Sequence, residues 1–383
     1  MILEKRLQEE IDQLKASENN RQVFPGSNEG KFIIREGQKL LNLSGNDYLG
    51  LASENDFLST EKKLSFQDLT SSSSRLLTGN SLAYHELELA ISASYAKSCL
   101  VFNSGYHANT GILPALCTKN DVILADKLVH ASLIDGIRLS QAQWLRFNHM
   151  DYDQLERLIQ KHSETAENIF VVVESIYSMD GDVTNLNKLV EFKKKYGIIL
   201  YVDEAHAAGI RGDKGLGLAE EQNCLEEIDV ITGTFGKALA SVGAYTVCSA
   251  VVKEYLINRC RTLIFTTALP PVSVYHSIKT WKLSLVSNEK RIHLRKLSDY
   301  FREQLQQMGL KTFGDSHIVP LISGDNASAI ELSEKLKNNG FLAMPIRHPA
   351  VPKGTARIRF SLSATLTKDD IDRVLNVLKQ YRS

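Results

Sequence analysis

The sequence predicts an α/β fold with a large domain around a mostly parallel central sheet and a small α+β domain at the C-terminal end. Between residues 98 and 249, short apolar runs alternate with amphipathic segments, which is the pattern of strand–helix repeats. The runs are continuous rather than alternating in polarity, which is typical of parallel strands covered by helices on both faces. A length of 383 residues leaves room for two or three domains.

The N-terminal segment is predicted to be an amphipathic helix. Its apolar residues Ile2, Leu3, Leu7, Ile11 and Leu14 share one helical face, so the helix should end near Asn19 and pack on the rest of the protein. Strands of the large domain are expected at 99–102, 122–125, 169–173, 198–202, 230–231 and 244–247. A helical stretch from about Val272 to Met308 should then lead out of that domain.

The small domain is predicted to contain a strand at 317–322, a helix at 327–339, strands near Phe341 and over 357–362, and a last helix from Lys368. We therefore expect an N-terminal helix and arm at 1–45, a large domain at 46–270, a connecting helix at 271–310 and a small domain at 311–383.

Composition favours a soluble, cytoplasmic protein. Hydrophobic residues make up 43% and charged residues 23% of the chain, which is ordinary for a globular protein. Lys plus Arg and Asp plus Glu each number 45, so no net field would attract nucleic acid or an acidic membrane. The five cysteines form no Cys-x-x-Cys pair, the N-terminus is charged from residue 4, and no apolar run approaches the ~20 residues that span a bilayer. Neither a metal site nor a nucleic-acid or membrane partner is expected.

Two short motifs predict a pyridoxal-phosphate site. Lys237 follows the small-residue turn Thr234-Phe235-Gly236, where its amine could reach an aldehyde, and Asp203 follows a continuous apolar run that suits a buried parallel strand. A carboxylate at the C-terminal edge of such a strand could pair with the ring nitrogen of the cofactor. On spacing alone, Asp203 could equally cap the next helix.

Eight motifs in order along the chain resemble the α-oxoamine synthases, which condense an amino acid with an acyl-CoA. They are Leu43-Ser44-Gly45-Asn46-Asp47-Tyr48-Leu49-Gly50, Ser74-Arg75-Leu76-Leu77-Thr78-Gly79, Ser104-Gly105-Tyr106-His107-Ala108-Asn109, His130-Ala131-Ser132, Ser178-Met179-Asp180-Gly181-Asp182, Asp203-Glu204-Ala205-His206, Thr234-Phe235-Gly236-Lys237 and Pro352-Lys353-Gly354-Thr355-Ala356-Arg357-Ile358-Arg359.

The resemblance implies the PLP-dependent transferase fold of type I and a pyridoxal 5'-phosphate cofactor. It implies that a small amino acid, with L-alanine expected, is joined to pimeloyl-CoA or a pimeloyl carrier protein with loss of CO2. Members of the family that use glycine or serine with another acyl-CoA are the nearest alternatives. A partner subunit without activity is a more distant alternative, because Lys237 and Asp203 are both present.

The resemblance also assigns roles to cofactor residues. His130 should stack on the pyridine ring, and His206 should lie beside the phenolic oxygen, although a surface histidine at a helix start is the plain alternative for His206. Ser178 should contact the cofactor. The phosphate should meet the turn at Gly105 and Tyr106, where a helix begins, and the hydroxyl of Thr234. Thr267 resembles a phosphate ligand donated by the neighbouring subunit, which implies a homodimer with shared active sites.

Three residues are expected to bind substrate. A guanidinium such as that of Arg347 can grip a carboxylate through two hydrogen bonds, although an exposed arginine in a proline-rich loop is the alternative. Asn46 resembles a second ligand of that carboxylate, and Arg21 resembles a residue at the entrance for the acyl chain. Two departures from the family lie nearby: the serine run 71–74 replaces a glycine-rich stretch, and Ala350 replaces a threonine. These departures leave the identity of the acyl chain undetermined.

Overall fold

The computed structural model describes residues 2–54 and 66–382, and its chain divides into two compact units. We call Leu49–Ser178 with Val183–Ile292 the sheet unit. We call Met1–Tyr48, Met179–Asp182 and His293–Ser383 the terminal unit, because it joins both ends of the chain. The boundary between the units falls within one helix, α12 (Asn288–Gln307).

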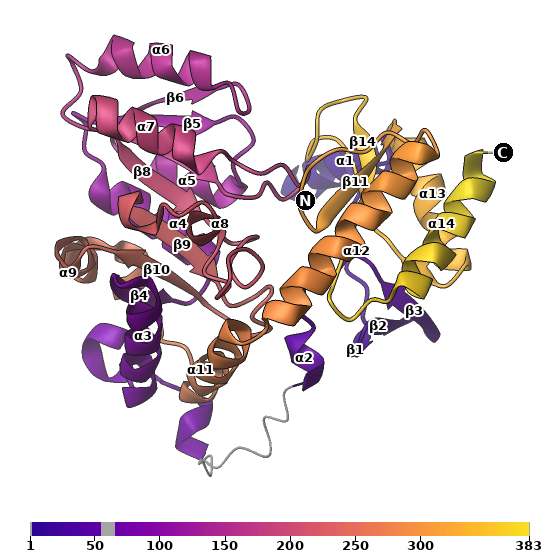
Figure 1. Ribbon diagram of the computed structural model, residues 1–383, viewed down its shortest axis with the longest axis horizontal. Helices are drawn as coiled ribbons and strands as arrows, with labels where there is room; N and C mark the ends of the chain where they lie inside the picture. The colour runs from indigo at the N-terminus through magenta and orange to yellow at the C-terminus, as the bar shows by residue number, and fades with distance from the viewer. Residues whose placement is uncertain (1, 55–65, 383) are drawn as a thin grey trace. The chain divides into compact units, whose positions relative to one another are not determined.

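The sheet unit is built on a seven-stranded sheet in the order β4-β10-β9-β8-β7-β5-β6 (Figure 1). Its strands are β4 (Ser98–Phe102), β5 (Val122–Asp126), β6 (Gln143–Phe147), β7 (Ile169–Glu174), β8 (Ile199–Asp203), β9 (Val230–Thr234) and β10 (Ala244–Cys248). The strands from β6 to β9 pair in parallel, whereas β10 runs antiparallel to both β9 and β4. The predicted mostly parallel sheet is confirmed.

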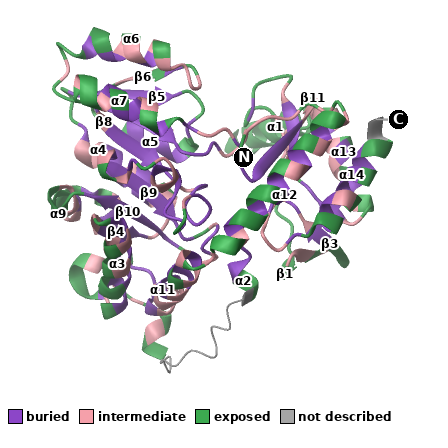
Figure 2. Cartoon of the chain, in the orientation of Figure 1, coloured by how far each residue is buried: buried purple, intermediate pink, exposed green. Residues whose placement is uncertain are grey.

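Both faces of this sheet are covered, as the continuous apolar runs predict. Successive side chains of a strand point to opposite faces, and in β7 and β8 neighbouring residues such as Val171 and Val172, or Leu200 and Tyr201, are all buried. Figure 2 shows the central strands β8 and β9 buried along their length. One face packs against α4 and α5, which contribute Ile112, Leu113, Leu133 and Ile137 to a shared core.

Several helices of the sheet unit begin at polar residues that cap them. Asp151, Asn185 and Ser249 each accept a hydrogen bond from a backbone N–H in the first turn of the helix that follows. The helices are α2 (Leu51–Glu54), α3 (Leu82–Tyr95), α4 (Gly105–Leu116), α5 (Ala131–Leu139), α6 (Tyr152–His162), α7 (Leu186–Tyr196), α8 (Leu218–Glu221), α9 (Ala250–Arg259), α10 (Arg261–Ile264) and α11 (Pro271–Leu285), with shorter helical turns at Phe66–Leu69, Arg75–Gly79 and Leu225–Glu227.

The terminal unit contains two small sheets. One has the order β1-β2-β3-β12, with β1 (Ser27–Glu29), β2 (Phe32–Arg35), β3 (Gln38–Asn42) and β12 (Phe341–Leu342), so it joins the two ends of the chain. The other has the order β11-β14-β13, with β11 (Ile318–Gly324), β14 (Ala356–Ser361) and β13 (Pro345–Ile346). Helices α1 (Ile2–Ala16), α13 (Asn326–Asn338) and α14 (Lys368–Arg382) belong to the same unit.

Three local features differ from the sequence-based expectations. The stretch 271–310 holds two helices instead of one, since α11 ends at Leu285 and α12 begins at Asn288. The arm before residue 45 holds strands β1, β2 and β3. Helix α1 has the predicted apolar face but no buried residue, so it does not pack on this chain as expected (Figure 2).

A short segment from the middle of the chain belongs to the terminal unit. Met179–Asp182 follows Ser178 in sequence, and it is held there by an ion pair between Asp180 and Arg357 of β14. Gly181 has a φ of +74°, and a Cβ at this position would lie 2.2 Å from the Ile318 carbonyl oxygen. The close approach and the positive φ both require glycine.

All five cysteines lie in the sheet unit and are buried as free thiols. They are Cys99, Cys117, Cys224, Cys248 and Cys260. Burial raises the pKa of each thiol, to about 11 for Cys224 and about 12 for Cys248. Within the described ranges, no helix is long and apolar enough to cross a membrane.

Candidate active site

Two cofactor residues predicted from the sequence, Asp203 and Thr234, lie at the C-terminal ends of neighbouring strands of the sheet unit. Glu174, Asp203 and Thr234 are the last residues of β7, β8 and β9. Glu174 and Asp203 are paired in register across the two parallel strands. Loops leave the sheet at this edge, so side chains from several strands can meet around a single ligand.

Asp203 is a buried carboxylate with fixed hydrogen-bond partners. Its side chain is 6% exposed, its Oδ2 accepts a 2.7 Å hydrogen bond from Asn109 Nδ2, and its Oδ1 accepts a 2.8 Å bond from the Ala205 backbone N–H. The second bond fixes the side chain over the turn that follows β8, but Asp203 does not cap a regular helix, since the next helix is α8. Helix capping is therefore not its role here.

Lys237 and His206 lie in direct contact. The distance between Lys237 Nζ and His206 Nε2 is 2.7 Å. Thr234 shapes the turn that presents the lysine, because its hydroxyl donates to the Gly243 carbonyl and accepts from the Gly236 N–H. The structure thus brings together the amine, the imidazole and the threonine that the sequence singled out.

His130 stands at the start of α5 with a defined tautomer. Its Nδ1 accepts a hydrogen bond from the Ser132 N–H, so a neutral ring carries its proton on Nε2. Burial lowers the pKa of His130, and the Lys237 amine lowers it further, while Asp203 opposes both effects. A neutral imidazole near Asp203 and Lys237 can lie against an aromatic ring and can donate one proton from Nε2.

The N-terminus of helix α4 has backbone amides that could bind an anion. Ser104 caps the helix by accepting from the His107 N–H, which leaves the amides of Gly105 and Tyr106 without acceptors inside the helix. A Cβ at Gly105 would lie 4.0 Å from Thr234 Cβ, so the two predicted phosphate residues are neighbours. The Tyr106 hydroxyl donates to Asp135, which raises the pKa of the tyrosine.

Two further cofactor candidates occupy the edges of the sheet unit. Ser178 immediately precedes the segment Met179–Asp182, which the terminal unit holds. Thr267 is exposed, and its carbonyl accepts a 2.7 Å hydrogen bond from Asn103 Nδ2, next to Ser104. The serine run 71–74 holds the segment around Thr267 in place. Ser74 forms a β-bridge with Thr267, and the Ser73 carbonyl accepts a hydrogen bond from the Ala268 N–H.

The predicted substrate residues lie in the terminal unit. Asn46 Oδ1 accepts a 2.9 Å hydrogen bond from the Tyr48 hydroxyl, and Arg359 of β14 donates to the same hydroxyl at 3.4 Å. Arg347 instead donates to the backbone carbonyls of Glu18 and Asn20. Among the described residues, no hydrogen bond joins Arg347 to Asn46, so the structure groups Asn46 with Arg359.

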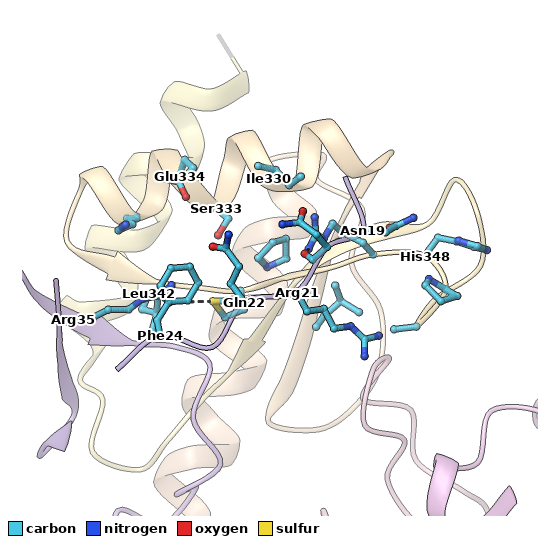
Figure 3. Close-up of a pocket in the computed structure, with 18 residues that line it drawn as sticks. Asn19, Arg21, Gln22, Phe24, Arg35, Ile330, Ser333, Glu334, Leu342 and His348 are labelled. Atoms are coloured by element: carbon cyan, nitrogen blue, oxygen red, sulfur yellow. Dashed lines mark hydrogen bonds between the residues drawn. The ribbon is translucent and has the colours of Figure 1, made fainter. Parts of the chain in front are cut away.

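Arg21 and Arg347 line one cavity of about 600 Å³ in the terminal unit. Figure 3 shows α13 residues Ile330, Ser333 and Glu334 on one side of this cavity and the segment with Arg21 and Gln22 across it. The cavity also holds the Arg35 guanidinium, which lies 3.6 Å from the centre of the Phe24 ring. Arg21 and Arg347, which were expected to have separate roles, therefore line the same cavity.

Asn109 is a site residue that the sequence did not reveal. It is 1% exposed, donates to Asp203 and to the Ser132 hydroxyl at 2.9 Å, and accepts from the Tyr201 hydroxyl at 2.8 Å. It thereby links the carboxylate at the end of β8 to the residue that holds His130. Its place in the motif Ser104–Asn109 was visible in the sequence, but its partners come from two other elements, β8 and α5.

The residues of the sheet unit fit pyridoxal phosphate. The donor set contains a partly buried amine, a hydrogen-bonded carboxylate, an imidazole in contact with the amine and a helix N-terminus beside a threonine hydroxyl. These are the groups needed for an aldehyde, a ring nitrogen, a phenolic oxygen and a phosphate. Within residues 2–54 and 66–382, no group of three or more His, Cys, Asp or Glu side chains could hold a metal ion.

Comparison with known protein families shows which family the chain belongs to. The model of the family "Aminotransferase class I and II" matches residues 38–378, nearly the whole chain. The chain belongs to this family. It is 46% identical over 392 residues to 8-amino-7-oxononanoate synthase of Chlorobaculum parvum, with 100% of both proteins covered.

Two solved structures show the same fold. A serine palmitoyltransferase (SPT) solved with PLP has a TM-score of 0.91 and 29% identity, with 99% of this chain and 98% of that chain covered. The 8-amino-7-oxononanoate synthase of Francisella tularensis has a TM-score of 0.76 and 28% identity, with 90% of this chain and 98% of that chain covered. These comparisons confirm the resemblance to α-oxoamine synthases, the fold of type I and the prediction of a pyridoxal-phosphate-dependent acyltransferase.

Proposed function

We propose that the protein condenses L-alanine with pimeloyl-CoA, or with a pimeloyl carrier protein, to give 8-amino-7-oxononanoate, CO2 and CoA or the free carrier. The observation that carries the proposal is the contact of Lys237 Nζ with His206 Nε2 at the strand edge that ends in Asp203. The 46% identity to a synthase of this name over the full length supports the choice of substrates.

Each cofactor residue has a distinct task in this proposal. Pyridoxal phosphate, when bound, withdraws electrons from the amino acid and so makes its Cα–H bond acidic. Lys237 Nζ would hold the cofactor aldehyde and later take the Cα proton. Asp203 would keep the ring nitrogen protonated, because its carboxylate is fixed by Asn109 and Ala205 and cannot turn away.

The two histidines and the helix N-terminus would orient the reacting groups. His206 would face the phenolic oxygen of the ring and His130 the flat face of the ring, from which it excludes water. Neutral His130 offers an Nε2 proton to an oxygen of the substrate. The amides of Gly105 and Tyr106, with the hydroxyls of Thr234 and Ser178, would hold the phosphate and the ring substituents.

Substrate recognition is assigned to the terminal unit. Arg347 and Asn46 were expected to grip the amino-acid carboxylate, and Arg359 is a further candidate because it shares the Tyr48 hydroxyl with Asn46. Arg21 would meet the acyl chain in the cavity that it lines with Arg347. The fixed positive charge of arginine suits a carboxylate of either substrate.

We infer a homodimer in which Thr267 reaches the partner subunit's phosphate site. Thr267 is exposed, and the neighbouring Phe265 and Leu77 are 71% and 79% exposed, which leaves an apolar surface around it. Analytical ultracentrifugation should show a dimer at working concentration. A fully active monomer would contradict the arrangement.

The test of the function is a panel of L-alanine, glycine and L-serine against pimeloyl-, acetyl- and palmitoyl-CoA, scored by thiol release and by product mass. We expect the highest kcat/KM for L-alanine with the pimeloyl thioester. In the cell, the reaction is proposed to take place in the cytoplasm. A preference for serine with palmitoyl-CoA would assign the chain to the activity named for its SPT neighbour instead.

A further inference from the structure

Glu174 is a buried carboxyl group inside the proposed cofactor site that the reaction above does not use. It ends β7 and stands in register with Asp203 at the end of β8. Only 3% of the residue is exposed. Parallel neighbours in register lie about 5 Å apart on the same face of a sheet, so the two carboxyl groups face the same space.

The two oxygens of Glu174 have different surroundings. The backbone N–H of His130, at the start of α5, faces the carboxyl group and acts to lower the pKa of Glu174. Its Oε1 is buried and has no hydrogen-bond partner among the described residues. The backbone of Glu174 is fixed as well, because its carbonyl accepts a 2.6 Å bond from the Thr184 hydroxyl.

The charges that face Glu174 come from four elements. Asp203 on β8 and Asp126 on β5 are negative, Lys237 after β9 is positive, and His130 before α5 contributes its amide. Asp126 is 1% exposed, and its Oδ1 lies 3.0 Å from His149 Nδ1. Buried Tyr177, which follows β7, is a titratable neighbour.

Two carboxylates this close in a buried place cannot both remain charged without a large free-energy cost. Asp203 accepts hydrogen bonds from two N–H groups, one on each oxygen, which stabilises its charged form. Glu174 has only the His130 N–H facing its carboxyl group, and its Oε1 has no donor among the described residues. Of the two carboxyl groups, Glu174 is therefore the one that carries a proton.

We propose that Glu174 is a positioning residue of the cofactor site: one of its oxygens holds the backbone of His130, and the other carries a proton that keeps a second negative charge away from Asp203. Glu174 thus fixes the imidazole that faces the cofactor ring and leaves Asp203 as the single anion for the ring nitrogen. The inference rests on the proposed cofactor roles of Asp203 and His130, and it is independent of the acyl substrate.

The electrostatics of the pocket agree with this assignment. Burial raises the pKa of Glu174 to about 8, with Asp203 adding to the rise and Lys237 opposing it. The group is then neutral at physiological pH and loses its proton only in mildly alkaline solution.

The first experiment reads the proton directly by infrared spectroscopy of the holoenzyme across a pH titration. The wild-type protein should show a carboxylic-acid C=O band at neutral pH that disappears with a midpoint near the pKa of about 8. Glu174→Gln should lack this band. Buried Glu204, whose pKa burial raises to about 7, should give a separate band that persists in the variant.

The second experiment measures the dissociation constant of pyridoxal phosphate for two variants. Glu174→Gln keeps an acceptor for the His130 N–H, so binding should stay within about twofold of wild type at neutral pH. Glu174→Leu removes the acceptor and leaves that N–H buried without a partner, so binding should weaken about tenfold or more. Glu88→Gln is the matched control, since Glu88 is a buried carboxylate of the same unit that pairs with Arg75 at 2.8 Å.

The proposal is overturned if no carboxylic-acid band is lost from the wild type between neutral and mildly alkaline pH, an outcome that needs no variant. It is also overturned if the band survives in Glu174→Gln, or if Glu174→Leu binds the cofactor as tightly as wild type. Since neither readout involves turnover, a failure of the pimeloyl substrate would refute the proposed function and leave this inference standing.

Discussion

Replacing Asn109 with leucine should weaken the site by an amount that follows from its hydrogen bonds. Leucine has nearly the size of asparagine, so the buried position neither opens a cavity nor becomes crowded. The change removes the donor to Asp203 Oδ2, the donor to Ser132 and the acceptor for Tyr201.

Two of the three groups that lose Asn109 keep a second hydrogen-bond partner. The Tyr201 hydroxyl keeps Thr232 Oγ1 at 3.0 Å, and the Ser132 hydroxyl keeps His130 Nδ1 at 2.8 Å. Asp203 Oδ2 keeps no such substitute among the described partners, so its charged hydrogen bond sets the cost. A hydrogen bond to a charged group contributes about 1.5–3 kcal/mol, and the free energy of unfolding should fall by that amount.

A double-mutant cycle of Asn109→Leu with Asp203→Leu isolates this contact, because neither variant can form it. Urea unfolding of the apo protein, followed by circular dichroism, should give a coupling free energy of about 1.5–3 kcal/mol. The matched control is Asn120→Leu, a loop asparagine outside the site that bonds Glu167 at 3.2 Å on the surface and should change stability by less than about 0.5 kcal/mol. A coupling below about 0.5 kcal/mol would refute the view that Asn109 holds Asp203.

Three further predictions concern the lysine, the substrate carboxylate and pH. Borohydride reduction of the holoenzyme should place the pyridoxyl label on Lys237, and a label on any other lysine would reject the assignment. Arg347→Ala should raise the KM for alanine at least tenfold, because about 2–4 kcal/mol of charged contact is lost, and Arg347→Lys should recover part of it. If the KM for alanine is unchanged in Arg347→Ala but raised in Arg359→Ala, the residue that binds the carboxylate is Arg359. The raised pKa values of Glu174 and Glu204, from the usual 4.5 to about 8 and about 7, mean that the folded protein holds these protons more tightly than the unfolded chain. The free energy of unfolding should therefore fall as pH rises from about 4.5 to about 8, and urea titrations with a flat profile over this window would contradict the two shifts.

The sheet and its chemistry were predictable because local sequence determines both. Continuous apolar runs mark the parallel strands, and a short polar motif follows each strand at the edge where ligands bind. The contact of Lys237 with His206 joins two motifs that the sequence had already singled out. The helix start at Gly105 was predictable because Ser104 is a good capping residue.

Features that depend on distant partners were not predictable. An apolar run such as 244–247 does not reveal that β10 runs antiparallel, because direction is set by its pairing with β4 and β9. The break between α11 and α12 falls at Val286 and Ser287, where the sequence has neither glycine nor proline to mark it. Asn109 is an unremarkable helix residue until its three partners are brought around it, and Arg347 shows its contacts with Glu18 and Asn20 only in the folded terminal unit.

The placement of the cysteines gives the molecule a built-in reporter on one half of its structure. The sheet unit holds all five thiols, and the terminal unit has none. A buried thiol with a raised pKa reacts with an alkylating reagent only when the chain around it opens. The rate of labelling therefore reports the opening of the sheet unit alone, without any engineered probe.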